Sequence, residues 1–281
     1  MPRKQIIKKE LNDKFYTNPK IAEYYFNELK NILQQFNINV DYFVEPSAGS
    51  GSFSSLLSEN DFAFDLIPEQ LYDGILIKEQ DWFTVTENDL KDGKMCIIGN
   101  PPFGNRNDLS KGFIKHACKL STCKVIAFVL PSVFDKLTMQ KVFNDEWKLI
   151  YNNSLPENSF ILDSDPYHVP CVFHVWVRDT EDEISTNLRE KEIPLENGII
   201  EFCSKDEATH FVFGAAPHKV IDKDAVLSNN RGYYFKCIMN EDNVVDLFRT
   251  ISWKDYGKSS VNGGVFWVTK QQIVKIITNI G

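Results

Sequence analysis

The chain has 281 residues, of which 43% are hydrophobic and 25% are charged, and this composition is typical of a globular protein with one large domain or one domain plus a small appendage. No run of about 18 consecutive apolar residues occurs, which excludes a transmembrane helix. The N-terminal sequence MPRKQIIKKELNDK is charged and lacks the apolar core of a secretory signal. We therefore expect a cytoplasmic protein (or one in the host cell interior, if viral) with no membrane partner.

The cysteine spacing and the charges bear on whether the protein binds a metal ion or nucleic acid. The six cysteines have no zinc-ligand spacing, so we expect no metal site. The net charge of -8 is unusual for a protein that binds nucleic acid, because phosphates attract clustered lysine and arginine. Two basic clusters nevertheless occur, and each is either a phosphate contact or a solvated helical face; they comprise Arg3, Lys4, Lys8 and Lys9, and Arg106, Lys111, Lys115 and Lys119.

Strand-like and helix-like segments alternate through the first 178 residues. Helical spacing of apolar residues predicts a helix over residues 17–36, with Thr17 or Asn18 as its N-cap and Pro19 in its first turn. A second helix is expected to begin at FSSLL, residues 53–57, and others follow the third and fourth strands. The predicted strands are residues 41–45, 62–65, 95–100, 124–131, 147–156 and 169–178. This alternation indicates a doubly wound α/β domain with a mostly parallel sheet and helices on both faces.

The C-terminal part has a different pattern. Residues 179–198 are polar and acidic and are expected to form a linker. Residues 199–281 then predict a small α+β appendage, with strands at 199–202, 210–215, 232–239 and 263–270 and a helix at 271–280. Its Arg231, Tyr233 and Tyr234 are candidates for target recognition, although packing or partner binding explains them equally well.

A glycine-rich turn, EPSAGSGS, joins a predicted strand to a predicted helix at residues 45–52. Gly49 and Gly51 permit a tight turn and a close approach of the backbone to a ligand. The helix that follows would present unpaired N–H groups. Such turns bind dinucleotides and phosphates as well as S-adenosylmethionine, so the turn alone does not select a ligand.

Three carboxylates near this turn favour S-adenosylmethionine. Glu45 ends the first strand, where a carboxylate can hold an ammonium group, and Asp65 ends the second, where doubly wound folds bind ribose hydroxyls. Asp81 is placed to accept a hydrogen bond from an adenine amino group, and Phe83 to stack on the adenine ring. NAD would also use Asp65, but nothing beyond residue 100 indicates a nicotinamide site. The alternative is that these carboxylates are helix caps or solvated strand ends.

The tetrapeptide NPPF, residues 100–103, follows an apolar strand. Pro101 and Pro102 fix two φ angles and hold Asn100 extended, which makes the loop rigid. The Asn100 side-chain oxygen and the Pro101 carbonyl are two acceptors for the two hydrogens of one amino group. They would orient its lone pair toward a sulfonium methyl and stabilise the charge that develops on nitrogen. Phe103 offers a face for a base taken out of its stack.

Together these motifs resemble the S-adenosylmethionine-dependent amino-methyltransferases of the NPPY/F type. The resemblance covers roughly residues 14–178 and rests on FYTNPKIAEYYF (residues 15–26), EPSAGSG and NPPF. It implies a Rossmann-like fold with a seven-stranded sheet and S-adenosyl-L-methionine as cofactor. The cofactor contacts that follow from the motifs are Tyr16, Thr17, Pro19, Glu45, Pro46, Ala48, Gly49, Gly51, Asp65, Asp81, Phe83 and Asn100. Phe160, Arg106 and Phe103 are expected at the substrate.

The predicted reaction is methylation of the exocyclic N6 amino group of adenine in nucleic acid, with DNA favoured over RNA. Relatives of this type methylate the amide of a protein glutamine, and the acidic net charge supports that alternative. A non-enzymatic binding protein and a cytosine N4 acceptor are less favoured, since NPPF and the glycine turn are both intact. The oligomeric state and the target sequence stay open. Nucleic-acid binding that weakens steeply with salt would separate the first two acceptors from a protein.

Overall fold

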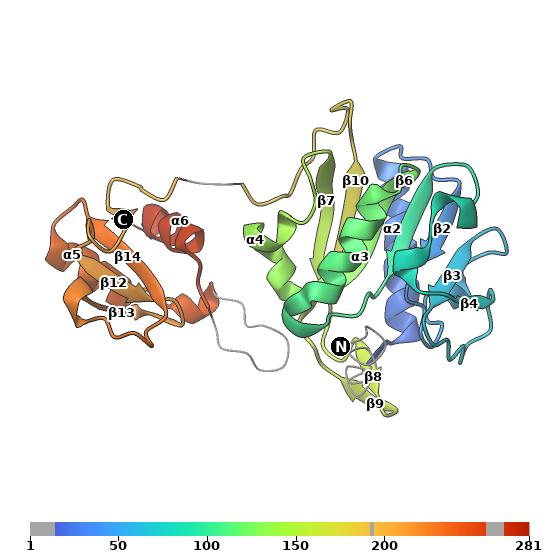
Figure 1. The fold of residues 1–281 in the computed structure, drawn as a ribbon, viewed down its shortest axis with the longest axis horizontal. Coiled ribbons are helices and arrows are strands. Elements are labelled where there is room, and N and C mark those ends of the chain that lie inside the picture. The colour runs from blue at the N-terminus through green and yellow to red at the C-terminus, as the bar shows by residue number, and fades with distance from the viewer. Residues whose placement is uncertain (1–14, 192–193, 257–266, 281) are drawn as a thin grey trace. The chain divides into compact units, whose positions relative to one another are not determined.

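The computed structural model describes residues 15–191, 194–256 and 267–280, and the chain divides into two compact units, residues 1–190 and 191–281. The first unit carries all the predicted site residues. Each unit has its own sheet (Figure 1).

A seven-stranded sheet forms the centre of the first unit (Figure 1). Its order is β4-β3-β2-β5-β6-β10-β7, and every strand runs parallel to its neighbours except β10, which is antiparallel to both β6 and β7. The mostly parallel, doubly wound seven-stranded sheet expected from the sequence is confirmed, and the fold is Rossmann-like. The strands are β2 (Tyr42–Glu45), β3 (Phe62–Asp65), β4 (Ile77–Glu79), β5 (Met95–Gly99), β6 (Cys123–Pro131), β7 (Trp147–Ser154) and β10 (Cys171–Arg178).

Helices cover both faces of this sheet because alternate strand residues point to opposite sides. On one face, α2 (Pro19–Gln35) packs Phe26 against Phe43 of β2 and Tyr25 against Phe173 of β10. On the other, α3 (Asp108–Lys119) buries Phe113 and Ile114 in the main core. The N-cap of α2 is Asn18, whose side chain accepts from the Lys20 amide, so one of the two predicted caps is the one used.

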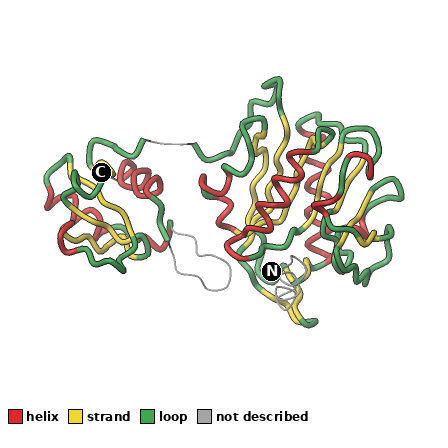
Figure 2. The backbone as a smooth tube through the Cα atoms, viewed as in Figure 1, coloured by secondary structure: helices red, strands yellow, loops and turns green. Residues whose placement is uncertain are grey.

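The connections around β3 and β4 consist of loops and three-residue 3₁₀ helices (Figure 2). The helix predicted at residues 53–57 is wrong: only a three-residue 3₁₀ helix, Ser54–Leu56, forms there. Ser54 and Ser55 are modest helix formers, and the Asp61 carboxylate accepts hydrogen bonds from both the amide and the hydroxyl of Ser58. The chain therefore turns directly into β3. The strand β4 was not predicted, since its sequence is too short and polar to stand out.

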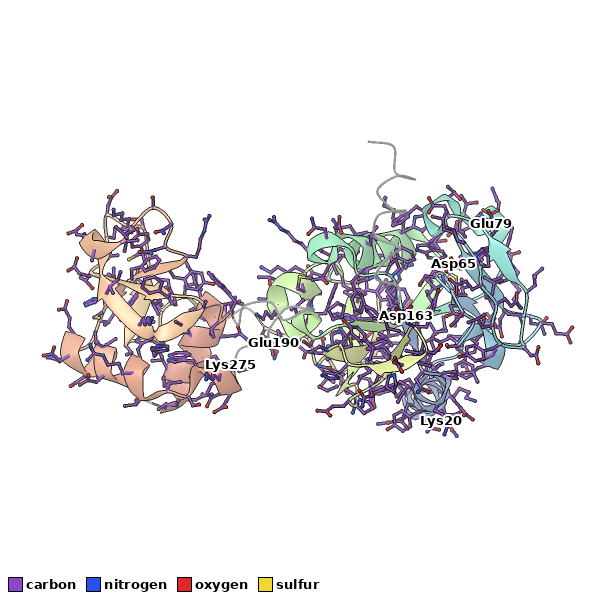
Figure 3. The ribbon with its side chains drawn as sticks, turned by 90° about the horizontal axis from the view of Figure 1, so that it is seen from below. Lys20, Asp65, Glu79, Asp163, Glu190 and Lys275 are labelled. Carbon is purple, nitrogen blue, oxygen red and sulfur yellow. The ribbon has the colours of Figure 1, made fainter. Side chains whose placement is uncertain are left out.

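A small three-stranded sheet adds the start of the chain to the first unit. The two-residue strand β1 (Tyr16–Thr17) pairs antiparallel with β8 (Phe160–Leu162), which forms a hairpin with β9 (Asp165–Tyr167). In the hairpin turn, labelled at Asp163 in Figure 3, Asp163 and Ser164 both have positive φ. This pairing brings residues near the N-terminus beside a loop about 140 positions later in the sequence, and pattern analysis of the sequence did not predict it.

The second unit is an antiparallel sheet of order β11-β14-β12-β13 with its own core. The sheet consists of β11 (Ile200–Phe202), β12 (His210–Phe213), β13 (Ala216–Asp222) and β14 (Gly232–Cys237), and it is accompanied by α5 (Glu241–Thr250) and α6 (Lys270–Ile280). An α+β unit was expected, but β13 and α5 were not. Of the strand predicted at 263–270, residues 263–266 lie outside the described residues, Trp267 forms an isolated bridge, and α6 begins at Lys270.

Part of the segment expected to be a linker packs against the first unit. Leu188 donates its amide to the Leu149 carbonyl of β7, and the Arg189 guanidinium donates to the Phe143 carbonyl. Asp179 forms an ion pair with Lys148, also from β7, at 2.9 Å. Residues 179–190 thus contact β7 at the edge of the sheet. Within the described residues, the helices are all too short or too polar to cross a membrane.

Candidate active site

The strand order reverses between β2 and β5, and ligands of doubly wound sheets bind beyond the carboxyl ends of strands at such a point. β2 ends at Glu45 and leads into the glycine turn, whereas β5 ends at Gly99 and leads into NPPF. A Cβ added to Gly99 would lie 3.3 Å from Cγ of Glu45, and Ser47 donates to the Asn100 carbonyl at 3.3 Å. The two motifs that were widely separated in sequence therefore meet.

The glycine turn is held by side chains from three directions. Gly49 has φ of +51°, and a Cβ there would lie 2.8 Å from the Tyr16 ring, so a larger residue would be both strained and crowded. Its amide donates to Oδ2 of Asp65 at 2.8 Å. Ser52 donates to the Thr17 carbonyl at 2.7 Å. The turn thus binds to β1 on one side and to the end of β3 on the other.

Asp65 lies where the sequence predicted it, at the carboxyl end of β3 and paired with Glu79 of β4 (Figure 3). Besides the Gly49 amide, its carboxylate accepts the Ile67 amide at 2.7 Å through Oδ1. Each carboxylate oxygen can accept more than one hydrogen bond. Asp65 is therefore both a structural brace of the turn and a candidate ribose contact.

Glu69 was not singled out from the sequence, yet it belongs to this region. The Tyr16 hydroxyl donates to its Oε1, and its own amide donates to the Gly49 carbonyl at 3.0 Å. Burial and the hydrogen bond to Glu69 raise the pKa of Tyr16, so the hydroxyl stays protonated and acts as a donor. Tyr16 of β1 and Glu69, which follows β3, thus both contact Gly49 of the glycine turn. Only the position of Glu69 four residues after a predicted strand end offered a signal.

Three buried polar atoms in this region have no hydrogen-bond partner among the described residues: Oγ1 of Thr17, Oε2 of Glu45 and Oδ1 of Asn100. A buried polar group without a partner costs about 1–3 kcal/mol, and such groups are rare in native structures. All three are residues that the sequence predicted at the site. Two are acceptors and one is a hydroxyl, so their chemistry suits a ligand that carries an ammonium group and an amino group.

Glu45 also has an unusual acidity. Its side chain is 2% exposed, and burial raises its pKa to about 8, with the charge of Asp65 adding to the rise. The buried carboxyl is therefore mostly protonated in the ligand-free protein at neutral pH. A ligand cation beside it would favour the ionised form. This combination of burial and perturbed pKa is characteristic of functional sites.

The NPPF loop is fixed by its neighbours. Pro101 is buried, and Ser110 of α3 donates to the Pro102 carbonyl at 3.1 Å. Phe103 is partly buried and packs edge-on against Phe15, with ring centroids 5.3 Å apart. The loop thus presents Phe103 to Phe15, the residue directly before β1.

Phe15, Phe103, Phe160 and Tyr167 form an aromatic cluster beside this loop. Phe15 lies 4.9 Å from Phe160 and 5.7 Å from Tyr167 between ring centroids. Phe160, the predicted base contact, is fully buried, whereas Tyr167 is partly exposed. Phe15 and Tyr167 were not picked out from the sequence, because only the β1–β8 pairing and the hairpin bring them here.

Asp81 and Phe83 lie at the end of the connection that follows β4. The Asp81 carboxylate accepts the Phe83 amide at 3.0 Å and caps the short 3₁₀ helix Trp82–Thr84. This is the capping arrangement that the sequence left as the alternative reading. Phe83 is partly buried and packs edge-on against Phe113 at 5.1 Å. Their roles at an adenine ring stay predictions.

The other predicted contacts are placed as follows. Pro46 and Ala48 are buried in the turn, and Ala48 donates to the Phe64 carbonyl at 2.9 Å. Gly51 has φ of +97°. Pro19 begins α2. Arg106 is exposed just after NPPF, and the cluster Arg3, Lys4, Lys8 and Lys9 lies outside the described residues.

Two comparisons with known proteins match the region of the chain that contains the glycine turn and NPPF. A family model described as the EDM2 methyltransferase-like domain matches residues 37–167, a range that includes both the glycine turn and NPPF. Protein ENHANCED DOWNY MILDEW 2 of Arabidopsis thaliana is 26% identical over 162 residues, which are 52% of this chain and 12% of that protein. The chain therefore spans about an eighth of the length of this relative.

Solved structures with similar folds are also methyltransferases. A putative RNA methyltransferase of Pyrococcus horikoshii has 13% identity and a TM-score of 0.42, with 64% of this chain and 99% of that chain covered. The 23S rRNA methyltransferase ErmE has 11% identity and a TM-score of 0.41, with 61% and 72% covered.

Proposed function

We propose that the first unit transfers a methyl group from S-adenosylmethionine to the exocyclic N6 amino group of adenine in nucleic acid. The observation that carries the proposal is the buried, unpartnered Oδ1 of Asn100 in the NPPF loop, together with the equally unpartnered Oε2 of Glu45 at the end of β2. The family match supports methyl transfer in general terms. The nature of the acceptor rests on the loop chemistry.

The residues around the glycine turn fit the cofactor group by group. Glu45 would take the ammonium, Thr17 the carboxylate through its hydroxyl, and Asp65 the ribose. Asp81 and Phe83 are assigned to the adenine. When bound, S-adenosylmethionine supplies a methyl group on a positively charged sulfur. The protein orients the reacting groups and surrounds them with buried polar groups, and these two effects provide most of the rate acceleration of such a displacement.

Asn100 performs the central task at the acceptor. Its Oδ1 accepts one hydrogen of the amino group, and the rigid Pro101–Pro102 backbone holds a second acceptor, the Pro101 carbonyl. These two bonds direct the nitrogen lone pair away from the ring and favour the developing positive charge. The nitrogen–carbon bond forms as the sulfur–carbon bond breaks, and the proton leaves to water afterward. Phe103 stacks on the base.

DNA is the favoured acceptor, and RNA is the alternative with the same chemistry. Methylation of a glutamine amide in a protein is the second candidate function, because the net charge of -8 opposes phosphate binding outside local basic patches. An amide NH₂ offers the same two hydrogens as adenine N6. The three acceptors differ in the salt dependence of binding and in the product.

The experiment is methyl transfer from labelled S-adenosylmethionine to duplex DNA, single-stranded DNA, RNA and a mixture of proteins, followed by nucleoside and amino-acid analysis. N6-methyladenine in one nucleic-acid pool is the expected result. Label in methylglutamine alone would replace adenine as the acceptor. Cofactor binding with no label in any pool would contradict the assignment of these acceptors.

The pKa of Glu45 makes cofactor binding pH-dependent. The pKa of Glu45 is about 8 in the folded protein, against 4.5 for an ordinary glutamate, so the Glu45 carboxyl is protonated between these pH values in the ligand-free protein. Ionised Glu45 is required to pair with an ammonium. We expect affinity for S-adenosylmethionine to rise from about pH 6 to about pH 8, with close to one proton released on binding at pH 7.

Calorimetric titration in two buffers with different ionisation enthalpies measures the released proton. Glu45→Gln, which cannot ionise, should bind more weakly and release no proton from this position. The raised pKa also affects stability. The free energy of unfolding should decrease as pH rises from 4.5 to 8, because the folded protein holds the proton more tightly than the unfolded chain. Glu45→Gln should lack this pH dependence. If the affinity of the unaltered protein for S-adenosylmethionine does not change with pH, Glu45 does not bind the ammonium group.

A further inference from the structure

Phe15 lies inside the aromatic cluster at the acceptor side of NPPF. Its ring is 5.3 Å from Phe103 and 4.9 Å from Phe160, and it meets both edge-on, at interplanar angles of 62° and 72°. Tyr167, 5.7 Å away, closes a third side. Phe103 and Phe160 are the two residues assigned to the base, and each contacts Phe15.

These distances leave Phe15 and a base in competition for one place. Aromatic rings in contact have centroids about 4.5–7 Å apart, so a base that stacks on Phe103 must lie within this shell. Phe15 already occupies it on the side that faces Phe160. A base that takes this side of Phe103 would therefore displace the Phe15 ring.

Phe15 is also connected to the cofactor side through the backbone of β1. Successive residues of an extended chain point to opposite sides, so Phe15 and Tyr16 face different partners. The Tyr16 ring covers Gly49, and its hydroxyl binds Glu69. The next residue, Thr17, pairs with Phe160. A shift of β1 that moves Phe15 therefore also moves the residue that lies over the glycine turn.

From this placement we infer that Phe15 occupies the position of the acceptor base in the ligand-free protein and is displaced when a base enters. Phe15 is then a positioning residue that competes with the substrate and couples the acceptor site to the cofactor site. This inference rests on the proposed function, since it takes the region between Phe103 and Phe160 as the base site.

The test is the variant Phe15→Ala in the full chain. Removal of a competing ring should lower KM for an adenine-containing 12-nucleotide DNA or RNA by about 2- to 12-fold, the equivalent of one aromatic contact of about 0.5–1.5 kcal/mol. Phe15→Trp, which is larger, should raise KM. Tyr24→Ala removes an exposed ring on α2 and should leave KM unchanged.

A binding measurement makes the test independent of turnover. The same oligonucleotides with 2-aminopurine in place of one adenine report stacking through fluorescence, and Phe15→Ala should bind them more tightly and with a weaker dependence on added cofactor product. A higher KM and weaker binding in Phe15→Ala would overturn the inference, because Phe15 would then be a stacking partner of the base. Thermal unfolding and cofactor affinity of each variant identify loss of fold.

Failure of the two proposals can be distinguished. If the unaltered protein methylates adenine but Phe15→Ala does not bind more tightly, the inference about Phe15 fails and the function stands. If the unaltered protein methylates no nucleic acid and does not bind the fluorescent oligonucleotides, both fail together. If it binds the fluorescent oligonucleotides and Phe15→Ala binds them more tightly without any transfer, the place of Phe15 stands and the proposed reaction fails.

Discussion

Replacement of Asn100 by alanine should reduce kcat by about 10²–10³-fold, the effect typical of removing one preorganised polar group at a developing charge. Affinity for S-adenosylmethionine should stay nearly unchanged, since the acceptor bond concerns the substrate nitrogen. The unfolding temperature should not fall, because Oδ1 of Asn100 has no partner within the described residues and its removal breaks no hydrogen bond there. Single-turnover methyl transfer and thermal unfolding measure the two effects.

Asn100→Asp is the matched control, because it retains an oxygen at the same position. It should keep more activity than Asn100→Ala. If turnover is unchanged in Asn100→Ala, the Asn100 side chain has no role in the reaction. A large loss of cofactor affinity would instead assign Asn100 to cofactor binding, and a large loss of stability would identify it as a structural residue of the site.

The second large effect concerns Asp65. Asp65→Ala removes the acceptor of the Gly49 and Ile67 amides as well as the proposed ribose contact. We expect cofactor affinity to fall by about 5- to 150-fold, which corresponds to about 1–3 kcal/mol for unpaired polar groups. Titration calorimetry measures it. Because the carboxylate also braces the turn, a lower unfolding temperature should accompany this loss.

Asp65→Asn separates the two roles of this side chain. The amide retains one acceptor oxygen for a backbone amide but loses the second acceptor and the charge. Its unfolding temperature should lie between those of the unaltered protein and Asp65→Ala, whereas its cofactor affinity should be close to that of Asp65→Ala. Unaltered cofactor affinity in both variants would place the ribose elsewhere.

The sequence predicted the sheet well because its strands are buried and continuous. β5 and β6 are uninterrupted apolar runs, and both were identified within one residue at each end. The short edge strand β4 and the helix expected at 53–57 were misjudged, since local propensity there competes with side-chain bonds such as those of Asp61. Strong burial therefore predicts structure better than weak propensity does.

The site was predictable only where motifs are local. Glu45 and Asn100 come from contiguous motifs, and the structure brings them together at the switch point of the sheet. Phe15, Glu69 and Tyr167 enter through pairing between β1 and β8 and through a loop, and no spacing in the sequence specifies such contacts. Long-range pairing of two-residue strands carries too little pattern to detect.

The pairing of β1 with β8 has a consequence for local stability. β1 has only two residues and is paired only with β8, whereas the central sheet has its own extensive core. Regions with few buried contacts open by local unfolding at a lower free energy than the core. The amides of β1 and β8 should therefore exchange hydrogen for deuterium well before those of β5 and β6, and ligands should slow that exchange selectively.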